Sequence, residues 1–159
     1  MDKYNLEKTV RNIVDHAIVK EVMSLRLAVR LIETVEKKAE EMGMRVVVAV
    51  SDASGRPVAV HCMDGAYHGS FDVALNKTYT STAFQMSTKE LSRLCQPGQD
   101  LYGLQFSNEG RVMILGGGEP LMVGDTMIGA LGVSGGTAVQ DTELAAYGKS
   151  MLKEVIACL

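Results

Sequence analysis

The stretch RVVVAVSDASGRPVAVHCM, residues 45–63, contains two valine-rich runs on either side of a turn. Such runs are typical of strands, and the intervening DASGRP supplies the aspartate, glycine and proline that favour a turn. Two strands joined by so short a connection lie antiparallel to each other. The sequence therefore predicts a β-hairpin here, and a β-sheet against which the rest of the chain must pack.

Two helical patterns precede this hairpin. Residues 5–22 place apolar side chains at positions 6, 10, 13, 14, 17 and 18, which is helical spacing, with charged side chains between them. A second helix is predicted from a cap at Ser24 to a stop at Gly43. We therefore expect an N-terminal amphipathic helix over residues 1–22, followed by a domain over residues 23–159.

Three more helices and three more strands are predicted after the hairpin. The segment 65–86 has the small and β-branched residues of a helix that packs closely on a sheet, and STKE at 87–90 is a capping box for a short helix. A final helix is capped by Asp141. The runs RVMIL, EPLMV and TMIGALGV predict strands at 111–115, 119–123 and 126–133. The fold class is therefore α/β (α+β), with a five-stranded, largely antiparallel sheet covered by helices.

Composition excludes several classes of function. The net charge is −3 and no run of lysine or arginine occurs, so nucleic acid is not an expected partner. No apolar run reaches the roughly 18 residues of a membrane helix, and the N-terminus lacks the apolar core of a signal peptide. We expect a cytoplasmic protein. Cys62, Cys95 and Cys158 show no C-x-x-C spacing, which indicates reduced thiols rather than a zinc ribbon.

The segment GVSGG, residues 132–136, fits the nucleophile-elbow pattern of hydrolases around Ser134. Those enzymes place the catalytic histidine after the serine, whereas His16, His61 and His68 all precede it. The run into Ser134 is also the end of an antiparallel meander rather than a central parallel strand. We therefore expect no catalytic role for Ser134, and interpret the glycines as residues that allow a sharp turn and a close approach.

Two glycine clusters, Gly116–Gly118 and Gly135–Gly136, border the predicted three-strand meander. Neither matches a phosphate-binding loop. Backbone N–H groups without side chains in the way can still cradle an anion such as a carboxylate or a propionate. A tight turn is the simpler interpretation of each cluster taken alone.

The strand end VAVHCM holds His61, Cys62 and Met63, whose side chains can all ligate haem iron. A hydrogen-bonded structural histidine is the alternative for His61. His61, His68 and Asp64 have no recognised metal-site spacing.

A ligand pocket is predicted where this strand end, the helix start at 67–70 and the glycine turns meet. Lys77, two helical turns after Ser70, can pair with a ligand carboxylate or with Asp64; a plain surface lysine is the alternative. The predicted ligand-binding residues are His61, Asp64, Gly65, His68, Ser70, Lys77, Gly116, Gly117, Gly118, Ser134, Gly135 and Gly136.

Residues 24–84 and GGGEPLMVGDTMIGALGVSGGTAVQD at 116–141 together resemble the GlcG/HbpS family of haem-binding and haem-degrading proteins. The specific parts include MDGA at 63–66, Asn76-Lys77, QPG at 96–98 and IGALGVSGG followed by Asp141. QPGQDLYGL at 96–104 is most similar to the C-terminal domain of PduO, the corrinoid adenosyltransferase of propanediol-utilisation microcompartments.

This resemblance implies a profilin-like α-β-α sandwich, a homo-oligomer that is often large, and binding of haem or another tetrapyrrole in some members. It does not imply adenosyltransferase activity, which belongs to a separate domain of PduO. It also implies an iron-ligating histidine early in the first helix of the domain, but this sequence has none between Ser24 and Met42. His61 and His16 are therefore the candidate haem ligands.

Three functions follow as hypotheses. The first is a module that binds a tetrapyrrole or small metabolite in a catabolic microcompartment. The second is an enzyme of small-metabolite or cofactor metabolism with a cleft around His61, Asp64 and Lys77, and the third is a structural oligomer. Residues 1–22 resemble the short amphipathic helices that target cargo into microcompartments, so shell or cargo proteins are expected partners. Packing on its own domain or on a sister subunit is the alternative for this helix.

Overall fold

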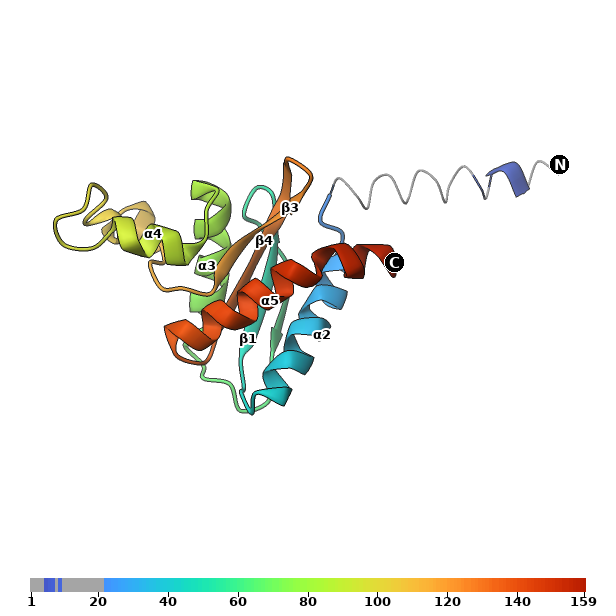
Figure 1. Ribbon diagram of the computed structural model, residues 1–159, viewed down its shortest axis with the longest axis horizontal. Helices are drawn as coiled ribbons and strands as arrows, with labels where there is room; N and C mark the ends of the chain where they lie inside the picture. The colour runs from blue at the N-terminus through green and yellow to red at the C-terminus, as the bar shows by residue number, and fades with distance from the viewer. Residues whose placement is uncertain (1–4, 8, 10–21) are drawn as a thin grey trace.

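A four-stranded antiparallel sheet, in the order β2-β1-β4-β3, lies at the centre of the molecule (Figure 1). The computed structural model describes residues 5–7, 9 and 22–159. The strands of the sheet are β1 (Val47–Asp52), β2 (Pro57–Cys62), β3 (Gly118–Val123) and β4 (Thr126–Ser134).

Helices cover both faces of this sheet. On one face, α2 (Leu25–Glu41) and α5 (Ala138–Ala157) lie side by side and enclose the main hydrophobic core with Val46, Val48 and Val50. On the other face, α3 (Ser70–Phe84) packs on Val47 and Ala49. The α-β-α layering predicted from the family resemblance therefore agrees with the structure.

The hairpin predicted at 45–63 is formed by β1 and β2, with Val48 opposite His61. Asp52 closes the turn because its Oδ1 accepts hydrogen bonds from the amides of Ser54, at 2.8 Å, and Arg56, at 3.0 Å. Gly55 supplies the positive φ of 74° that the turn requires. The turn chemistry of DASGRP therefore sets the register of the first two strands.

The sheet has four strands, so the predicted fifth strand at 111–115 is wrong. In this segment the Met113 amide donates a hydrogen bond to Thr80 Oγ1 of α3, at 2.8 Å. Val112 is buried in a separate small core with Leu91 and Cys95, against which Ile114 also packs. The run of apolar residues in RVMIL thus reflects packing of Val112 and Ile114 in this small core rather than pairing with a strand.

That small core stabilises a projection at one side of the molecule, which is visible at the left of Figure 1. It contains α4 (Thr88–Leu94) and the short 3₁₀ turns η1 (Leu104–Phe106) and η2 (Asn108–Gly110). The capping box predicted for α4 is present, because Ser87 accepts from the Glu90 amide and Glu90 accepts from the Ser87 amide.

The last helix begins earlier than predicted. Its cap is Thr137, whose side chain accepts a hydrogen bond from the Gln140 amide in a second capping box. Asp141, the predicted cap, lies in the first turn of α5 and is buried. The structure thus frees its carboxylate for a tertiary interaction that local sequence cannot reveal.

The packing of α3 on the sheet depends on two glycines. Gly118 of β3 and Gly132 of β4 lie opposite each other in the sheet. A Cβ on Gly132 would collide with the carbonyl oxygen of Ala74, and one on Gly118 would lie 2.8 Å from that of Lys77. The backbone of α3 therefore approaches the sheet more closely than any side chain at these positions allows. This confirms the close helix–sheet packing predicted for the segment.

Of the predicted N-terminal helix over residues 1–22, the structure describes residues 5–7 and 9, which are helical, and Val22, which lies in a bend. The rest of residues 1–21, including His16, lies outside the described residues. Within the described parts of the chain, no helix is long and apolar enough to cross a membrane.

Candidate functional site

The predicted ligand-binding residues occupy three separate places, and His61 is the first. Its side chain projects from the edge strand β2 toward α2, where its Nδ1 lies 3.2 Å from both carboxylate oxygens of Glu36. The His61 side chain is 35% exposed and that of Glu36 22%. The pair is therefore reachable from solvent, and the Glu36 carboxylate orients the imidazole ring.

The second place is the connection between β2 and α3, where Asp64, Gly65 and His68 are exposed. Gly65 has a φ of 85°, which suits the tight turn that follows the strand. Ser70 is buried at the start of α3. No cluster of three or more potential metal ligands exists among the described residues, so His61, His68 and Asp64 do not converge on a metal ion.

The third place is a buried ion pair between Lys77 of α3 and Asp141 of α5. Lys77 Nζ donates to Asp141 Oδ2 at 2.8 Å and to the carbonyl oxygen of Val133 at 2.6 Å. The two side chains are 1% and 5% exposed. The predicted pairing of Lys77 with Asp64 is therefore wrong, and so is the alternative that Lys77 is a surface lysine.

The glycine clusters surround this ion pair. Gly117 has a φ of 113°, and a Cβ on it would lie 2.9 Å from Lys77 Nζ and 2.8 Å from Asp141 Cβ. The amide of Gly136 donates to Asp141 Oδ1 at 2.8 Å. Glycine at these turns thus makes room for the lysine and supplies a donor to the carboxylate. The geometry of Gly117 and Gly136 is therefore explained by their close contact with Lys77 and Asp141, without a bound anion.

Burial lowers the pKa of Lys77, an effect that the neighbouring Asp141 carboxylate opposes. The ammonium group has three N–H donors, and two of them are used within the protein. A ligand would have to enter the core to contact Lys77. Through Val133 and Asp141, Lys77 therefore connects α3 to the end of β4 and to α5, which is a structural role.

Ser134 ends β4 opposite Val47 and is buried. The histidines that the structure describes, His61 and His68, belong to β2 and to the turn that follows it. That Ser134 is not a hydrolase nucleophile stays a prediction.

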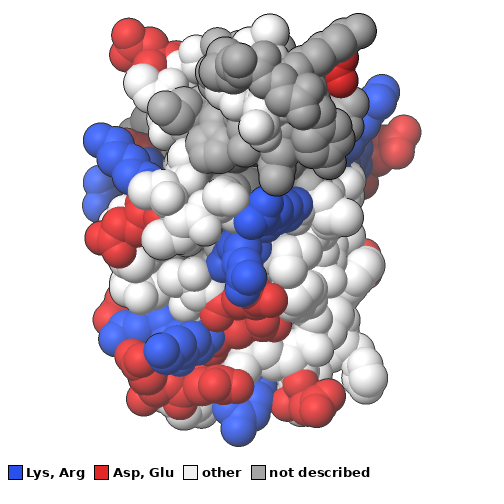
Figure 2. Space-filling view, turned by 90° about the vertical axis from the view of Figure 1, so that its right-hand side faces the viewer, with Lys and Arg blue, Asp and Glu red and all other residues white. Residues whose placement is uncertain are grey.

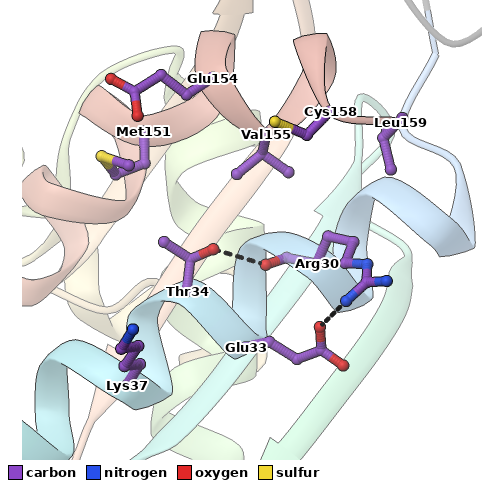
Figure 3. A pocket seen from close by; sticks show the side chains of 9 residues that line it. All are labelled: Arg30, Glu33, Thr34, Lys37, Met151, Glu154, Val155, Cys158 and Leu159. Carbon is purple, nitrogen blue, oxygen red and sulfur yellow. Dashed lines mark hydrogen bonds and ion pairs between the residues drawn. The ribbon is translucent and has the colours of Figure 1, made fainter.

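A groove of about 520 Å³, which was not predicted from the sequence, lies between α2 and α5 (Figure 3). Arg30 and Lys37 lie along the α2 wall, whereas Met151, Val155 and Cys158 lie along the α5 wall. Arg30 is engaged by Glu33 at 3.0 Å. Figure 2 shows basic and acidic side chains interspersed on one face of the molecule, without a broad patch of one sign. The groove could not be found from sequence because two helices distant in the chain form it.

Two partners of the predicted residues were also missed as site residues, Glu36 and Asp141. Asp141 was noted only as a helix cap and as a part of the family resemblance, and Glu36 had no local signal beyond its position on α2. Their roles depend on contacts across 25 and 64 residues of sequence.

Comparison with known proteins decides the family. The model described as haem degrading protein HbpS-like matches residues 23–149. The chain belongs to the HbpS-like family. The resemblance predicted from the motifs in MDGA, QPG and IGALGVSGG is therefore confirmed.

Curated relatives include a 15.0 kDa protein encoded between dhaT and dhaS in Citrobacter freundii. It is 42% identical over 123 residues, which are 77% of this HbpS-like chain and 87% of that protein. The corrinoid adenosyltransferase PduO of Citrobacter freundii is 37% identical over 108 residues, or 68% of this chain. The aligned region is 32% of PduO, so the chain matches about a third of that protein's length.

Solved structures share the fold. Klebsiella pneumoniae ORFY is 39% identical, with a TM-score of 0.81 over 84% of this chain and 92% of that chain. The PduOC:heme complex is 33% identical, with a TM-score of 0.78 over 81% and 94%. A variant of HbpS from Streptomyces reticuli is 25% identical, with a TM-score of 0.73 over 82% and 87%.

Proposed function

We propose that this HbpS-like protein binds haem or another tetrapyrrole, with His61 as the iron ligand. The observation that carries this proposal is the hydrogen-bonded pair of His61 and Glu36, at 3.2 Å, on an accessible edge of the sheet. The likeness to PduOC, whose complex with haem has been solved, supports it.

The donor set fits a haem iron. Histidines that bind metals commonly donate one ring N–H to a carboxylate, which fixes the tautomer and makes the other nitrogen a better ligand. Glu36 can hold the proton at Nδ1 of His61 in this way, which leaves the lone pair of Nε2 free to coordinate a metal ion. Haem, if bound here, would supply an iron that accepts such a nitrogen as a ligand.

The position of His61 on the edge strand β2 also supports a homo-oligomer. A tetrapyrrole has two large apolar faces, and His61 lies at a partly exposed strand edge where one chain covers only part of such a ligand. A second copy that packs against this edge would cover the remainder. We therefore include self-association, as the family resemblance implies, in the proposed function.

Haem titration tests the proposal. Ligation shifts the Soret band, so we expect a saturable shift with the wild-type protein and its loss in His61→Ala. His68→Ala is the matched control, because His68 is an exposed histidine only seven residues away in the β2–α3 turn. A shift that persists in His61→Ala and disappears in His16→Ala would assign the iron to His16 and overturn the role of His61.

We further propose that residues 1–22 direct the protein into a bacterial microcompartment by binding shell or cargo proteins. Support comes from the apolar stripe of this segment and from the likeness of the remaining chain to PduO. The test is a fusion of residues 1–22 to a fluorescent protein in a host that forms microcompartments. Punctate fluorescence is expected, with a fusion carrying Ile13→Lys and Ile18→Lys as the control, and diffuse fluorescence of the native fusion contradicts the proposal.

The enzyme hypothesis has less support. Its three residues lie in different surroundings: His61 is paired with Glu36, Asp64 is exposed in a turn, and Lys77 is enclosed with Asp141. Groups so placed do not converge on one reacting atom, which acid–base catalysis requires.

A further inference from the structure

A second hollow, of about 250 Å³, lies between α4 and the first turn of α5. Its α4 wall carries Lys89 and Arg93, which are four residues apart and so lie on the same side of the helix. The first turn of α5 and Gly116 form the other walls. Apart from Gly116, none of the residues predicted to bind a ligand lines it.

The two cations of this hollow have no ionic partner among the described residues. The neighbouring carboxylates are engaged elsewhere. Glu90 Oε2 accepts from the amide of Ser87 at 3.1 Å and from its hydroxyl at 2.9 Å. Asp141 is held by Lys77 and Gly136 inside the protein. The Ser87 hydroxyl and amide lower the pKa of Glu90, and the charge of Arg93 makes a smaller contribution in the same direction. Neither Lys89 nor Arg93 forms a direct ion pair with a described carboxylate, so both cations remain available to a ligand in the hollow.

The opposite wall adds hydrogen-bond donors. The first N–H groups of a helix have no acceptor within the helix, and the Thr137 side chain accepts only from the amide of Gln140, at 3.3 Å. The amides of Ala138 and Val139 thus remain available at the start of α5. A Cβ on Gly116 would collide with the hydroxyl of Thr142, so the backbone there lies directly against α5 and closes the hollow.

We propose that this hollow is a binding site for a small oxyanion, either a phosphate group or a carboxylate group. The guanidinium of Arg93 and the ammonium of Lys89 form charge-assisted hydrogen bonds with such a group, and the free amides of α5 favour the same charge. Val139, 77% exposed at the rim, offers an apolar contact for the remainder of a larger ligand. The site is on a different part of the fold from His61 and does not depend on haem.

Calorimetric titration of the full chain in a low-salt chloride buffer tests the site, with inorganic phosphate and propionate as separate probes. We expect saturable binding of at least one probe. The double variant Lys89→Gln/Arg93→Gln should weaken it about 100-fold, since each lost charged hydrogen bond lowers affinity about tenfold. Arg26→Gln/Arg30→Gln is the matched control, because it removes two exposed cations at the same spacing from α2 and should leave affinity unchanged.

A second variant, Val139→Glu, places a negative charge at the rim of the hollow without touching the core, and it should also abolish binding. If only inorganic phosphate binds, the site is specific for phosphate groups. If propionate binds, the site accepts carboxylate groups. Failure of both probes to bind the wild-type protein would overturn the proposal. So would equal affinities of the wild type and the Lys89→Gln/Arg93→Gln variant, or equal weakening in the α2 control.

Discussion

At the scale of single residues, the buried ion pair of Lys77 and Asp141 links α3 to α5. Because both side chains are almost fully buried, removal of either partner leaves an uncompensated charge in the core. We expect Lys77→Met to lower the free energy of unfolding by about 3–5 kcal/mol. Urea denaturation of the variant and of the wild type measures the difference.

The control is the ion pair between Lys149 and Glu119, whose lysine side chain is 44% exposed. Exposed pairs contribute about 0–1 kcal/mol, so Lys149→Met should have a correspondingly small effect. If both variants lose the same stability, the burial of Lys77 has no special energetic role.

The lowered pKa of Lys77 makes stability depend on pH. Burial moves the pKa below the ordinary 10.5, and Asp141 offsets only part of this effect. Between the folded-state pKa and 10.5 the unfolded chain binds more protons at Lys77 than the folded chain, so this contribution to stability increases with pH. It is complete above 10.5 and is lost as the pH falls through the folded-state pKa.

We therefore expect the stability difference between the wild type and Lys77→Met to grow as the pH rises from neutral toward 10.5. Urea denaturation at several pH values in this range measures it. A difference that stays constant or shrinks would contradict a lowered pKa for this lysine.

At the scale of elements, the contact of α3 with the sheet depends on the absence of side chains at Gly118 and Gly132. A Cβ on Gly132 meets the backbone of Ala74, which cannot move without shifting the whole helix. We expect Gly132→Ala to lower the free energy of unfolding by about 3 kcal/mol, at the upper end for overpacking.

The matched control is Gly69→Ala, because Gly69 lies just before α3 with an ordinary φ of −65° and no atom within 4 Å of an added Cβ. It should change stability by less than about 1 kcal/mol. Thermal or urea denaturation compares the two variants, and similar losses in both would argue against the close helix–sheet contact.

At the scale of the whole molecule, Met23 is the first of the described residues to enter the main core, and Ser24 caps α2 by accepting from the amide of Leu27 at 3.1 Å. We therefore expect a chain shortened by residues 1–21 to unfold in one cooperative transition, with a free energy of unfolding within about 1 kcal/mol of the full chain. Urea denaturation followed by circular dichroism measures it. A shortened chain that does not fold would show that the N-terminal segment packs on the domain or on a sister subunit, rather than serving as a separate targeting helix.

The elements that were predicted correctly depend on short-range chemistry. The hairpin follows from Asp52 and Gly55 in its turn, and the start of α4 from the capping box at Ser87. The segment 111–115 is not a strand because apolar residues in a short run bury equally well against helices or in a sheet, and the Met113 amide donates to the side-chain hydroxyl of Thr80 on α3.

The family, the α-β-α layering and most of the helices and strands could be predicted from the amino-acid sequence, because they follow from motifs, hydrophobic spacing and turn residues that lie close together in the chain. Which charged groups pair with each other depends on the three-dimensional packing. Lys77 and Asp141 are 64 residues apart in the sequence, and His61 and Glu36 are 25 apart. Both contacts form only when the helices pack on the sheet. The two hollows arose in the same way, because each lies between helices whose spacing is set by the core and not by any local pattern of residues.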